Sequence, residues 1–434
     1  MRFKYFAECR RSIVDALLLS DEQTAVACVD PRELELFSND PRIHVIDHHN
    51  PSKQSGPFDT VFTIKLIEYV SDIPQSFSRI RASLDPNGRM VVFTFSRLWQ
   101  PLVRLLTLMR LRTGHEIENW VPPSDLINFL ELADFEMVTK SSHVLVPFEI
   151  PIISRVLNRW VAPLPLFRSL CFVTAITARP RVEPHLGEAA SVSIVIAARN
   201  EAGHIPELLD RIPHIAPKQE VILVEGGSED NTWEVIEGEI ARRQGRDPHL
   251  SYRLLRQPGK GKADAIRHGF EHSSGDILVI LDADISVPPE ELGKFTDALV
   301  RGHCRFANGS RLVYSMEKDA MRFLNLLGNR FFGSLFTFLI GQPIRDTLCG
   351  TKAMWKTDYE RIVANRDYFG DFDPFGDFDL LFGAARLGIR IRDVPIHYKA
   401  RSYGSTNISR FRHGFLLFRM SGIAARKIRF PQTA

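Results

Sequence analysis

Short, continuously apolar runs alternate with helix-like stretches along this chain, and no other feature limits its possible folds so strongly. In the second half the runs lie at 192–198, 220–227 and 276–284, and the segments between them have the apolar spacing of helices. Runs that are apolar at every position are typical of parallel strands covered by helices on both faces. This pattern predicts a doubly wound α/β fold, in which ligands bind at the carboxyl ends of the strands.

The first half of the chain shows the same alternation. Residues 73–84 have the apolar period of a helix, and the turn sequence "DPNG" follows at 85–88. Four strand-like runs flank or precede this helix: 24–30, 43–49, 58–64 and 89–95. We therefore expect a second α/β domain with a largely parallel sheet.

A polar segment rich in proline, "TARPRVEPHLGEAAS" at 177–191, separates the two patterns. A chain of 434 residues is also too long for one ordinary hydrophobic core. We expect four parts: a first domain at 1–178, a linker at 179–190, a second domain at 191–415 and a basic amphipathic tail at 416–434.

Composition excludes several classes of protein. The net charge of +3 is too small to indicate nucleic-acid binding, and we expect no such partner. Five cysteines without paired or metal-type spacing indicate free thiols and a reducing cytoplasm. The first residues lack the apolar stretch of a secretory signal, and arginines interrupt the most apolar windows, 152–178 and 324–341. We expect a cytoplasmic protein without a membrane span, and peripheral contact with the inner face of the plasma membrane remains open.

Two aspartates end the apolar run at 276–284. Asp282 and Asp284 are two residues apart, so on an extended strand their side chains project to the same side. Two such carboxylates, together with the phosphates of a substrate, form a usual site for Mg²⁺ or Mn²⁺. The alternative is structural, because Asp284 or Ser286 could cap the helix expected to begin at residue 288.

Polar motifs follow the neighbouring strands in the same way. Glu201 and Glu225 come just after the first two strands of this domain, where a carboxylate can accept hydrogen bonds from a base or a ribose. Lys260 and Lys262 stand in the glycine-rich segment 259–269, which can approach a diphosphate closely. Together these residues favour a nucleotide-sugar site over a simple helix cap.

These motifs resemble family 2 glycosyltransferases with the GT-A fold, in particular the polyprenyl- and dolichyl-phosphate glucosyl or mannosyl synthases. The resemblance covers about residues 190–415. It rests on six ordered stretches: "VEGGSEDNT" (224–232), "GKGKADAI" (259–266), "LDAD" (281–284), "IRDTLCGTKAMWK" (344–356), "DPFGDFDLLFGAARLG" (373–388) and "VPIHYKARSYGSTNISRFRHG" (394–414).

The resemblance implies an inverting transfer of a hexose from a nucleoside diphosphate sugar. In that scheme Asp282 and Asp284 hold a metal that neutralises the leaving diphosphate. Asp377 and Asp379 take the place of the acidic residues near the acceptor, and the structural alternative for them is an acidic loop with helix caps. Arg401 belongs to a stretch that closes over a phosphate, a group that arginine binds bidentately.

The acceptor and the sugar stay open at this level. The branch implies a lipid phosphate, a glycolipid or a growing glycan as the acceptor, and "VEGGS" with "DTLCGTK" gives UDP-glucose a mild preference. From residue 401 to the end there are seven arginines or lysines and no acidic residue. A basic amphipathic tail is typical of contact with a membrane surface, although a solvated tail has the same composition.

Residues 24–178 resemble the later part of a class I methyltransferase that uses S-adenosylmethionine. The family's first strand and its glycine-rich cofactor loop have no counterpart ahead of residue 24. Asp30 and Asp47 align with residues that hold the cofactor, but they fit turns equally well. We interpret this domain as truncated or degenerate and expect no S-adenosylmethionine binding; the alternative function is a methyltransferase acting on glycans, with a sugar-binding second domain. The helix expected at 97–112 is basic and amphipathic, which we interpret as a solvated or interdomain face.

Overall fold

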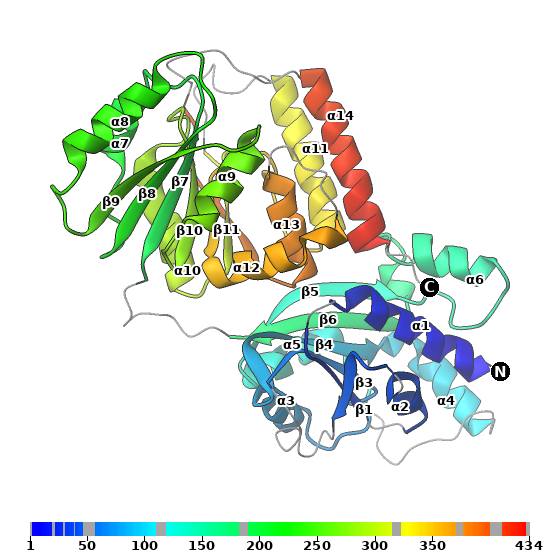
Figure 1. Cartoon of the computed structure of the whole chain (residues 1–434). Coiled ribbons are helices and arrows are strands. Elements are labelled where there is room, and N and C mark those ends of the chain that lie inside the picture. The colour runs from blue at the N-terminus through cyan, green and yellow to red at the C-terminus, as the bar shows by residue number, and fades with distance from the viewer. Residues whose placement is uncertain are drawn as a thin grey trace. The chain divides into compact units, whose positions relative to one another are not determined.

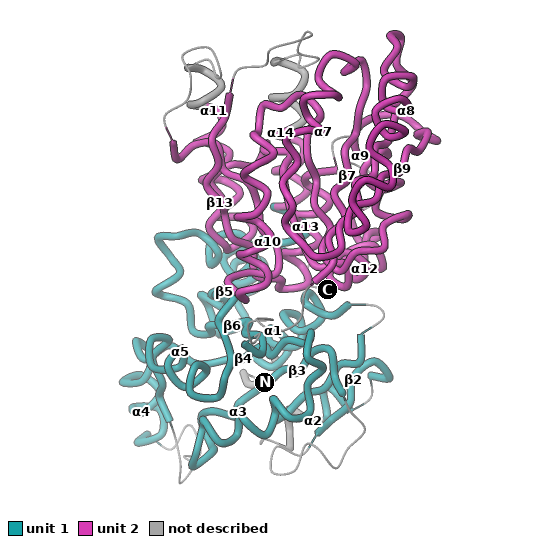
Figure 2. The backbone as a smooth tube through the Cα atoms, turned by 90° about the vertical axis from the view of Figure 1, so that its left-hand side faces the viewer, with its two compact units in different colours: residues 1–181, 425–434 teal, residues 182–424 magenta. Residues whose placement is uncertain are grey.

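The computed structural model describes residues 2–19, 22–28, 31–38, 40–46, 57–109, 119–181, 190–314, 323–369, 376–399 and 410–430. The chain forms two compact units (Figure 2). Unit 1 comprises residues 1–181 together with 425–434, and unit 2 comprises residues 182–424. The last ten residues therefore belong to the same unit as the first 181.

Unit 1 contains a six-stranded sheet in the order β2-β1-β3-β4-β6-β5 (Figure 1). Its first four strands are parallel to one another, and β6 runs antiparallel to both β4 and β5. The strands are β1 (Thr24–Cys28), β2 (Ile43–Ile46), β3 (Phe58–Ile64), β4 (Leu84–Phe95), β5 (Phe135–His143) and β6 (Val173–Pro180). All four strand-like runs of the first half are thus confirmed as strands.

Several helices of this unit cover both faces of its sheet, because each of these has an apolar stripe to bury. Ile13 and Val14 of α1 pack on one face together with Phe37 of α2. Phe77 of α3 and Leu126 of α5 pack on the other. The helices are α1 (Arg2–Leu17), α2 (Pro31–Ser38), α3 (Ile73–Arg81), α4 (Gln100–Leu108), α5 (Pro123–Leu132) and the short α6 (Ile153–Val156).

The sheet of unit 1 has no strand between β1 and β3. Val26 pairs directly with Phe62, in a parallel register that runs from Thr24 to Cys28. In a doubly wound sheet of order 3-2-1-4, the first strand lies between the second and the fourth. If β1 corresponds to the second strand of the methyltransferase pattern, as the sequence analysis predicts, its direct pairing with β3 leaves no place between them for the glycine-loop strand.

Unit 2 contains a seven-stranded sheet in the order β13-β11-β12-β10-β7-β8-β9. The neighbours β10, β7, β8 and β9 are parallel, which is the 4-1-2-3 half of a doubly wound sheet. The strands are β7 (Val192–Ala198), β8 (Gln219–Glu225), β9 (Leu250–Arg256), β10 (Ile277–Asp282), β11 (Phe306–Ser310), β12 (Lys352–Trp355) and β13 (Ile391–Pro395). This arrangement confirms the predicted α/β class.

The helices of unit 2 lie on both faces of its sheet. Leu208 of α7 and Phe295 of α10 belong to the apolar core on one face. On the other face α9 approaches β7 so closely that a Cβ at Gly269 would overlap the Val195 side chain. The helices are α7 (Ile205–Arg211), α8 (Thr232–Arg243), α9 (Lys262–Glu271), α10 (Leu292–Val300), α11 (Phe323–Ile340), α12 (Lys356–Ala364), α13 (Asp377–Arg386) and α14 (Arg410–Ala424).

Element ends differ from the predicted boundaries in several places. Helix α3 ends at Arg81, and β4 begins at Leu84, so the turn predicted at 85–88 is wrong and these residues belong to the strand. β6 continues to Pro180, because Arg179 and Pro180 pair with the start of β5, so the first residues of the predicted linker belong to a strand. Helix α14 crosses the predicted domain end at residue 415, and residues 425–434 join unit 1. Among the described residues, no helix combines the length and the apolar character that crossing a bilayer requires.

Candidate functional site

The predicted site residues of unit 2 gather at one edge of its sheet. The parallel registers place Glu225 beside Ala198 and Asp282 beside Ala197, so β7, β8 and β10 end together. The strand order reverses between β7 and β10, and in doubly wound sheets ligands bind at this switch point. Asp282, the last residue of β10, therefore stands at the place where the fold favours a ligand.

The turns after β7 and β8 are bonded to each other. The Glu225 carboxylate accepts a hydrogen bond from the Ser228 amide at 2.6 Å, and the Ser228 hydroxyl accepts one from the Asn200 amide at 2.9 Å. Asn200 has a φ of 57°, in the left-handed region that asparagine tolerates. Glu201 lies just before α7, where its carboxylate is 2.6 Å from Nδ1 of the buried His204. Both predicted glutamates thus shape the two turns.

The lysine-containing loop folds around one aspartate. Asp264 accepts hydrogen bonds from the Gly259 amide and the Gln257 side chain, each at 2.9 Å. Gly261, with a φ of +89°, then turns the chain into α9. The loop presents its two lysines differently: Lys260 is exposed, whereas Lys262, at the start of α9, points its ammonium group to Asp282 Oδ1 at 2.5 Å.

Asp284 stands beyond the end of β10. Its Oδ1 accepts hydrogen bonds from the Ser286 amide at 3.1 Å and the Ser286 hydroxyl at 2.7 Å, around Ile285 at a φ of 55°. The next helical turn begins at residue 289 and receives no side-chain cap. The helix-cap interpretation of Asp284 is therefore wrong, because its carboxylate closes a tight turn instead.

Asp377 joins this group from a distant part of the chain. Gly376, in the left-handed conformation at φ +78°, precedes α13, and a Cβ there would lie 3.1 Å from the Cα of Ala263. This contact brings the start of α13 against the start of α9. The Asp377 carboxylate forms an ion pair at 3.0 Å with Lys352 Nζ, and the Lys352 side chain is fully buried.

Charge balance in this cluster keeps Lys262 protonated. Burial alone would lower the pKa of Lys262, but the negative charges of Asp282 and Asp377 outweigh it and raise the pKa above its ordinary value. The two carboxylates and the two lysines, Lys262 and Lys352, thus form one mixed-charge group at the sheet edge.

Asp379, the other predicted acidic residue of this segment, has different neighbours. Its Oδ2 lies 3.1 Å from Arg267 Nη2 on α9 and 2.8 Å from Arg366 Nε, and the carboxylate is buried. A buried carboxylate between two arginines ties three chain segments together. The structure therefore separates the two aspartates: Asp377 lies among the lysines, and Asp379 lies in an arginine cluster.

Two further residues complete the site, and our sequence analysis did not single them out. A Cβ at Gly350 would overlap both Asp282 Oδ2 and Lys262 Nζ, so glycine leaves the room beside the carboxylate. Lys352 follows two residues later in β12 and donates to the Cys349 carbonyl as well as pairing with Asp377. The available signal was a lysine inside a short apolar strand, since such a lysine needs a buried partner.

An internal ion pair holds the segment that leads to Gly350. Arg311 contacts Asp346 through two hydrogen bonds, of 2.7 and 2.9 Å, and both side chains are largely buried. Burial would raise the pKa of Asp346, but the arginine lowers it below its usual range. The Asp346 carboxylate also accepts the Leu348 amide, which fixes the turn ahead of Gly350.

The donor set fits a hard divalent cation. Asp282 and Asp284 supply carboxylate oxygens, the ligands that Mg²⁺ and Mn²⁺ prefer, and Gly350 lets the Asp282 carboxylate lie close against the backbone. A bound cation would share Asp282 with Lys262. Arg401, the predicted phosphate-binding arginine, lies outside the described residues.

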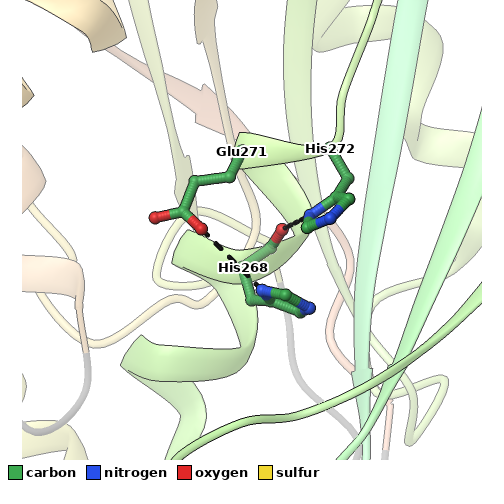
Figure 3. A group of neighbouring side chains, drawn as sticks. All are labelled: His268, Glu271 and His272. Carbon is green, nitrogen blue, oxygen red and sulfur yellow. Dashed lines mark hydrogen bonds and ion pairs between the residues drawn. The ribbon is translucent and has the colours of Figure 1, made fainter.

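A second group of potential metal ligands occupies the opposite end of α9. Ligand atoms of His268, Glu271 and His272 lie within 4.8 Å of one another (Figure 3). His272 Nδ1 is 2.8 Å from the His268 carbonyl, and His268 Nδ1 is 3.8 Å from Glu271. A helix of ten residues is roughly 15 Å long, so this group is separate from the site at Lys262.

At the corresponding edge of unit 1, aromatic rings surround the end of β4. Phe95 ends β4, and its ring lies 5.1 Å from Phe172, 6.0 Å from Phe6 and 6.3 Å from Trp120, measured between centroids. Trp99 adds an edge-on contact with Phe172 at 5.7 Å. Asp30 and Asp47, the candidate cofactor ligands, lie outside the described residues, as do His48 and His49.

Comparison with family models identifies a domain in each unit. Residues 193–363 match the model described as glycosyl transferase family 2, and residues 9–140 match a methyltransferase domain model. These matches agree with both resemblances inferred from the motifs.

Curated relatives share only part of the chain. It is 30% identical to glycosyltransferase AglJ of Haloferax volcanii, over 46% of this chain and 60% of that protein. It is 33% identical to an undecaprenyl-phosphate 4-deoxy-4-formamido-L-arabinose transferase of Yersinia pestis, over 51% and 63%. It is 27% identical to a dolichol-phosphate mannosyltransferase of Pyrococcus furiosus, over 55% and 67%. The chain thus spans about two thirds or less of these relatives.

Among solved structures, the chain resembles glucosyl-3-phosphoglycerate synthase from Mycobacterium tuberculosis, crystallised with Mn²⁺, uridine diphosphate and glucosyl-3-phosphoglycerate. The TM-score is 0.40 at 18% identity, over 56% of this chain and 82% of that one.

Proposed function

We propose that unit 2, whose residues 193–363 form a glycosyl transferase family 2 domain, moves a hexose from a nucleoside diphosphate sugar to a polyprenyl phosphate. The observation that carries the proposal is the group of Lys262, Asp282, Lys352 and Asp377 at the switch point of the sheet. Paired lysines and carboxylates at such an edge suit a ligand that carries both phosphates and a divalent cation.

The donor side of this group offsets the charge of the leaving diphosphate. Lys262 stays protonated at neutral pH, because the neighbouring carboxylates raise its pKa. Asp282 and Asp284 would hold Mg²⁺ or Mn²⁺, which when bound supplies further positive charge beside the diphosphate. Glu225 and Glu201 stand beyond the neighbouring strands, where they suit the ribose and the base, and the exposed Lys260 suits the outer phosphate.

The acceptor side fits an oxygen that is already anionic. Asp377 is held in an ion pair with the buried Lys352, so its carboxylate is better suited to orienting a group than to removing a proton. A phosphate oxygen has no proton to lose. It forms its bond to the anomeric carbon on the face opposite the leaving diphosphate. The bond between that carbon and the diphosphate oxygen breaks at the same time, and its electron pair leaves with the nucleoside diphosphate.

Two relatives support the choice of acceptor, since their names state undecaprenyl phosphate and dolichol phosphate. A lipid acceptor would place the enzyme at the inner face of the plasma membrane. We take UDP-glucose as the first donor to test, because the segments around Glu225 and Asp346 resemble the glucosyl branch.

A panel of nucleotide sugars tests this proposal directly. Purified protein is incubated with each donor, a polyprenyl phosphate and Mn²⁺, and release of nucleoside diphosphate is measured with and without the acceptor. We expect release that depends on the acceptor with one donor, and its loss on chelation. Acceptor-independent hydrolysis with every donor would refute the lipid-phosphate acceptor.

A further inference from the structure

One face of unit 1 leaves an unusual amount of apolar side chain exposed. In helix α4 none of the nine residues is buried, although the helix is rich in leucine. Its exposed side chains repeat at helical spacing, so they form a stripe along one side. They are Leu98 just before the helix, Leu102, Leu105, Leu108 and Met109.

A second segment, 148–170, adds to this face. Leu166 is 85% exposed and Ile152 is 76% exposed, and Trp160 is also exposed. The remaining exposed apolar residues of the segment are Phe148, Ile150, Ile153, Val156, Leu164 and Leu170. Single exposed apolar residues are ordinary, but this many within two short segments indicate an interaction surface.

Three contacts join these pieces within unit 1. The Trp99 indole donates to the Leu170 carbonyl at 2.9 Å, which links the start of α4 to segment 148–170. The ring of Phe430 stacks on Trp160 at 5.3 Å, and Arg429 donates to the Pro163 carbonyl at 2.8 Å. The apolar–basic surface, as we call it, thus comprises residues 97–109, 148–170 and 425–430.

Basic side chains dominate the charge of this surface. Segment 97–109 contains Arg97 and Arg104 and no acidic residue, and segment 148–170 contains three arginines against Glu149 alone. Arg426 and Lys427 are exposed at the C-terminal end. The surface therefore carries seven exposed or partly exposed basic side chains, on a chain whose total formal charge is only +3: Arg97, Arg104, Arg155, Arg159, Arg168, Arg426 and Lys427.

The backbone also holds one apolar residue outward at a conformational cost. Ile152 has a φ of 65°, a region that β-branched residues rarely adopt, yet its side chain faces solvent. Burial in the core of unit 1 does not account for this conformation. Strained residues of this kind concentrate at functional sites.

We propose that the apolar–basic surface of unit 1 docks on a bilayer that contains anionic lipids. Exposed leucine, isoleucine and tryptophan insert at the level of the headgroups, and interleaved arginines pair with lipid phosphates. Seven basic side chains against Glu149 alone favour an anionic lipid surface over a partner of mixed charge. Docking by unit 1 goes beyond the transfer reaction, although it deepens that proposal by holding unit 2 near a lipid acceptor.

Vesicle binding of the full-length chain tests the proposal. Wild-type protein should sediment with phosphatidylglycerol-containing vesicles and much less with pure phosphatidylcholine. Leu166→Gln should lower the partition coefficient by roughly tenfold, which corresponds to about 1.4 kcal/mol of lost apolar burial. Leu132→Gln is the matched control, because Leu132 is 65% exposed in the same unit but lies on α5.

Charge reversal tests the contribution of the basic side chains of this surface. Arg155→Glu combined with Arg159→Glu should weaken binding to anionic vesicles, whereas Arg79→Glu on α3 should have little effect. Equal binding of Leu166→Gln and Leu132→Gln would overturn the proposal. So would a wild-type dimer that Leu166→Gln converts to a monomer without any change in vesicle binding, since the surface would then serve self-association.

Failure of docking is distinguishable from failure of the transfer reaction. Transfer to a short-chain polyprenyl phosphate in detergent needs no bilayer, so Leu166→Gln should retain that activity. Asp282→Asn should bind vesicles like wild type while losing transfer. A protein that transfers in detergent but ignores anionic vesicles would overturn only the docking proposal.

Discussion

Both units build a doubly wound sheet, but the carboxyl edges of the two sheets carry opposite kinds of side chain. In unit 2 the edge holds lysine–carboxylate pairs at Asp282 and Asp377. In unit 1 the end of β4 packs phenylalanine and tryptophan rings around Phe95. An α/β core is stabilised by apolar burial on the two faces of its sheet, so the side chains at its edge can differ between two such sheets.

A second difference between the two sheets lies at their centre. In unit 2, β7 is strand 1 of the 4-1-2-3 order and lies between β10 and β8. It is followed by the turn that carries Asn200 and Glu201. In unit 1 β1 pairs directly with β3, in register from Thr24 to Cys28. The parallel sheet of unit 1 is thus continuous without a strand at that position.

The largest expected effect is on the edge of unit 2. Asp282→Asn removes the partner of Lys262 and one metal ligand, and we expect transfer to fall by roughly 10²–10³-fold. Phe95→Leu, at the edge of unit 1, should leave transfer unchanged. Steady-state release of nucleoside diphosphate measures both, and equal losses in the two variants would break the contrast between the edges.

Lys352→Met should destabilise unit 2. The change leaves Asp377 buried without its nearest cation, at a cost of about 3 kcal/mol, and Lys262 offsets only part of the charge. Denaturant unfolding measures the effect. Adding Asp377→Asn to this variant should restore most of the stability, and a single variant as stable as wild type would show that the ion pair is unimportant.

Gly350→Ala should reduce activity more than stability. The new Cβ would displace Asp282 and Lys262 from each other, and such misplacement costs roughly 10²-fold in rate. Gly238→Ala on α8 is the control, because no atom lies within 4 Å of its added Cβ. If both variants kept full activity, close packing at Gly350 would have no role in the reaction.

Acid should weaken unit 1 through His143. Burial, and then the charge of Arg429, lower the pKa of His143 to about 4. The unfolded chain binds this proton near pH 6.5, so stability falls as the pH drops from there toward 4. Three of the five tryptophans report on unit 1, namely Trp99, Trp120 and Trp160. When the protein is acidified, their fluorescence should show an unfolding midpoint at a higher pH in wild type than in His143→Asn.

The smallest expected effect is that of S-adenosylmethionine. Because β1 pairs directly with β3 and no glycine-rich loop precedes residue 24 in the sequence, we expect no heat of binding and no shift in the unfolding temperature. Titration calorimetry measures this. Binding in the micromolar range would make the two units alike in keeping a ligand at the sheet edge and would revive the methyltransferase alternative.

Local patterns predicted most of the fold and part of the site. The apolar runs placed the strands that carry Glu225 and Asp282, because their periodicity is a property of neighbouring residues. The partnership of Lys352 with Asp377 could not be predicted, since the two residues are brought together only when α13 packs on α9 at Gly376. The arginine pair around Asp379 has the same origin, and motif spacing alone could not separate its role from that of Asp377.

The C-terminal tail shows the same limit of prediction from sequence. Its basic, apolar composition was visible in the sequence, but the stacking of Phe430 on Trp160 joins residues 270 positions apart. Composition alone could not assign residues 425–434 to the first unit.

The assignment of residues 425–434 to unit 1 sets an order on synthesis. A ribosome releases these residues only after all of unit 2 has been made, so residues 1–181 lack the contacts at Trp160 and Pro163 while unit 2 emerges and folds. Unit 1 is thus started before unit 2 and completed after it. A nascent chain stalled before residue 425 would carry all of unit 2 attached to an incomplete unit 1.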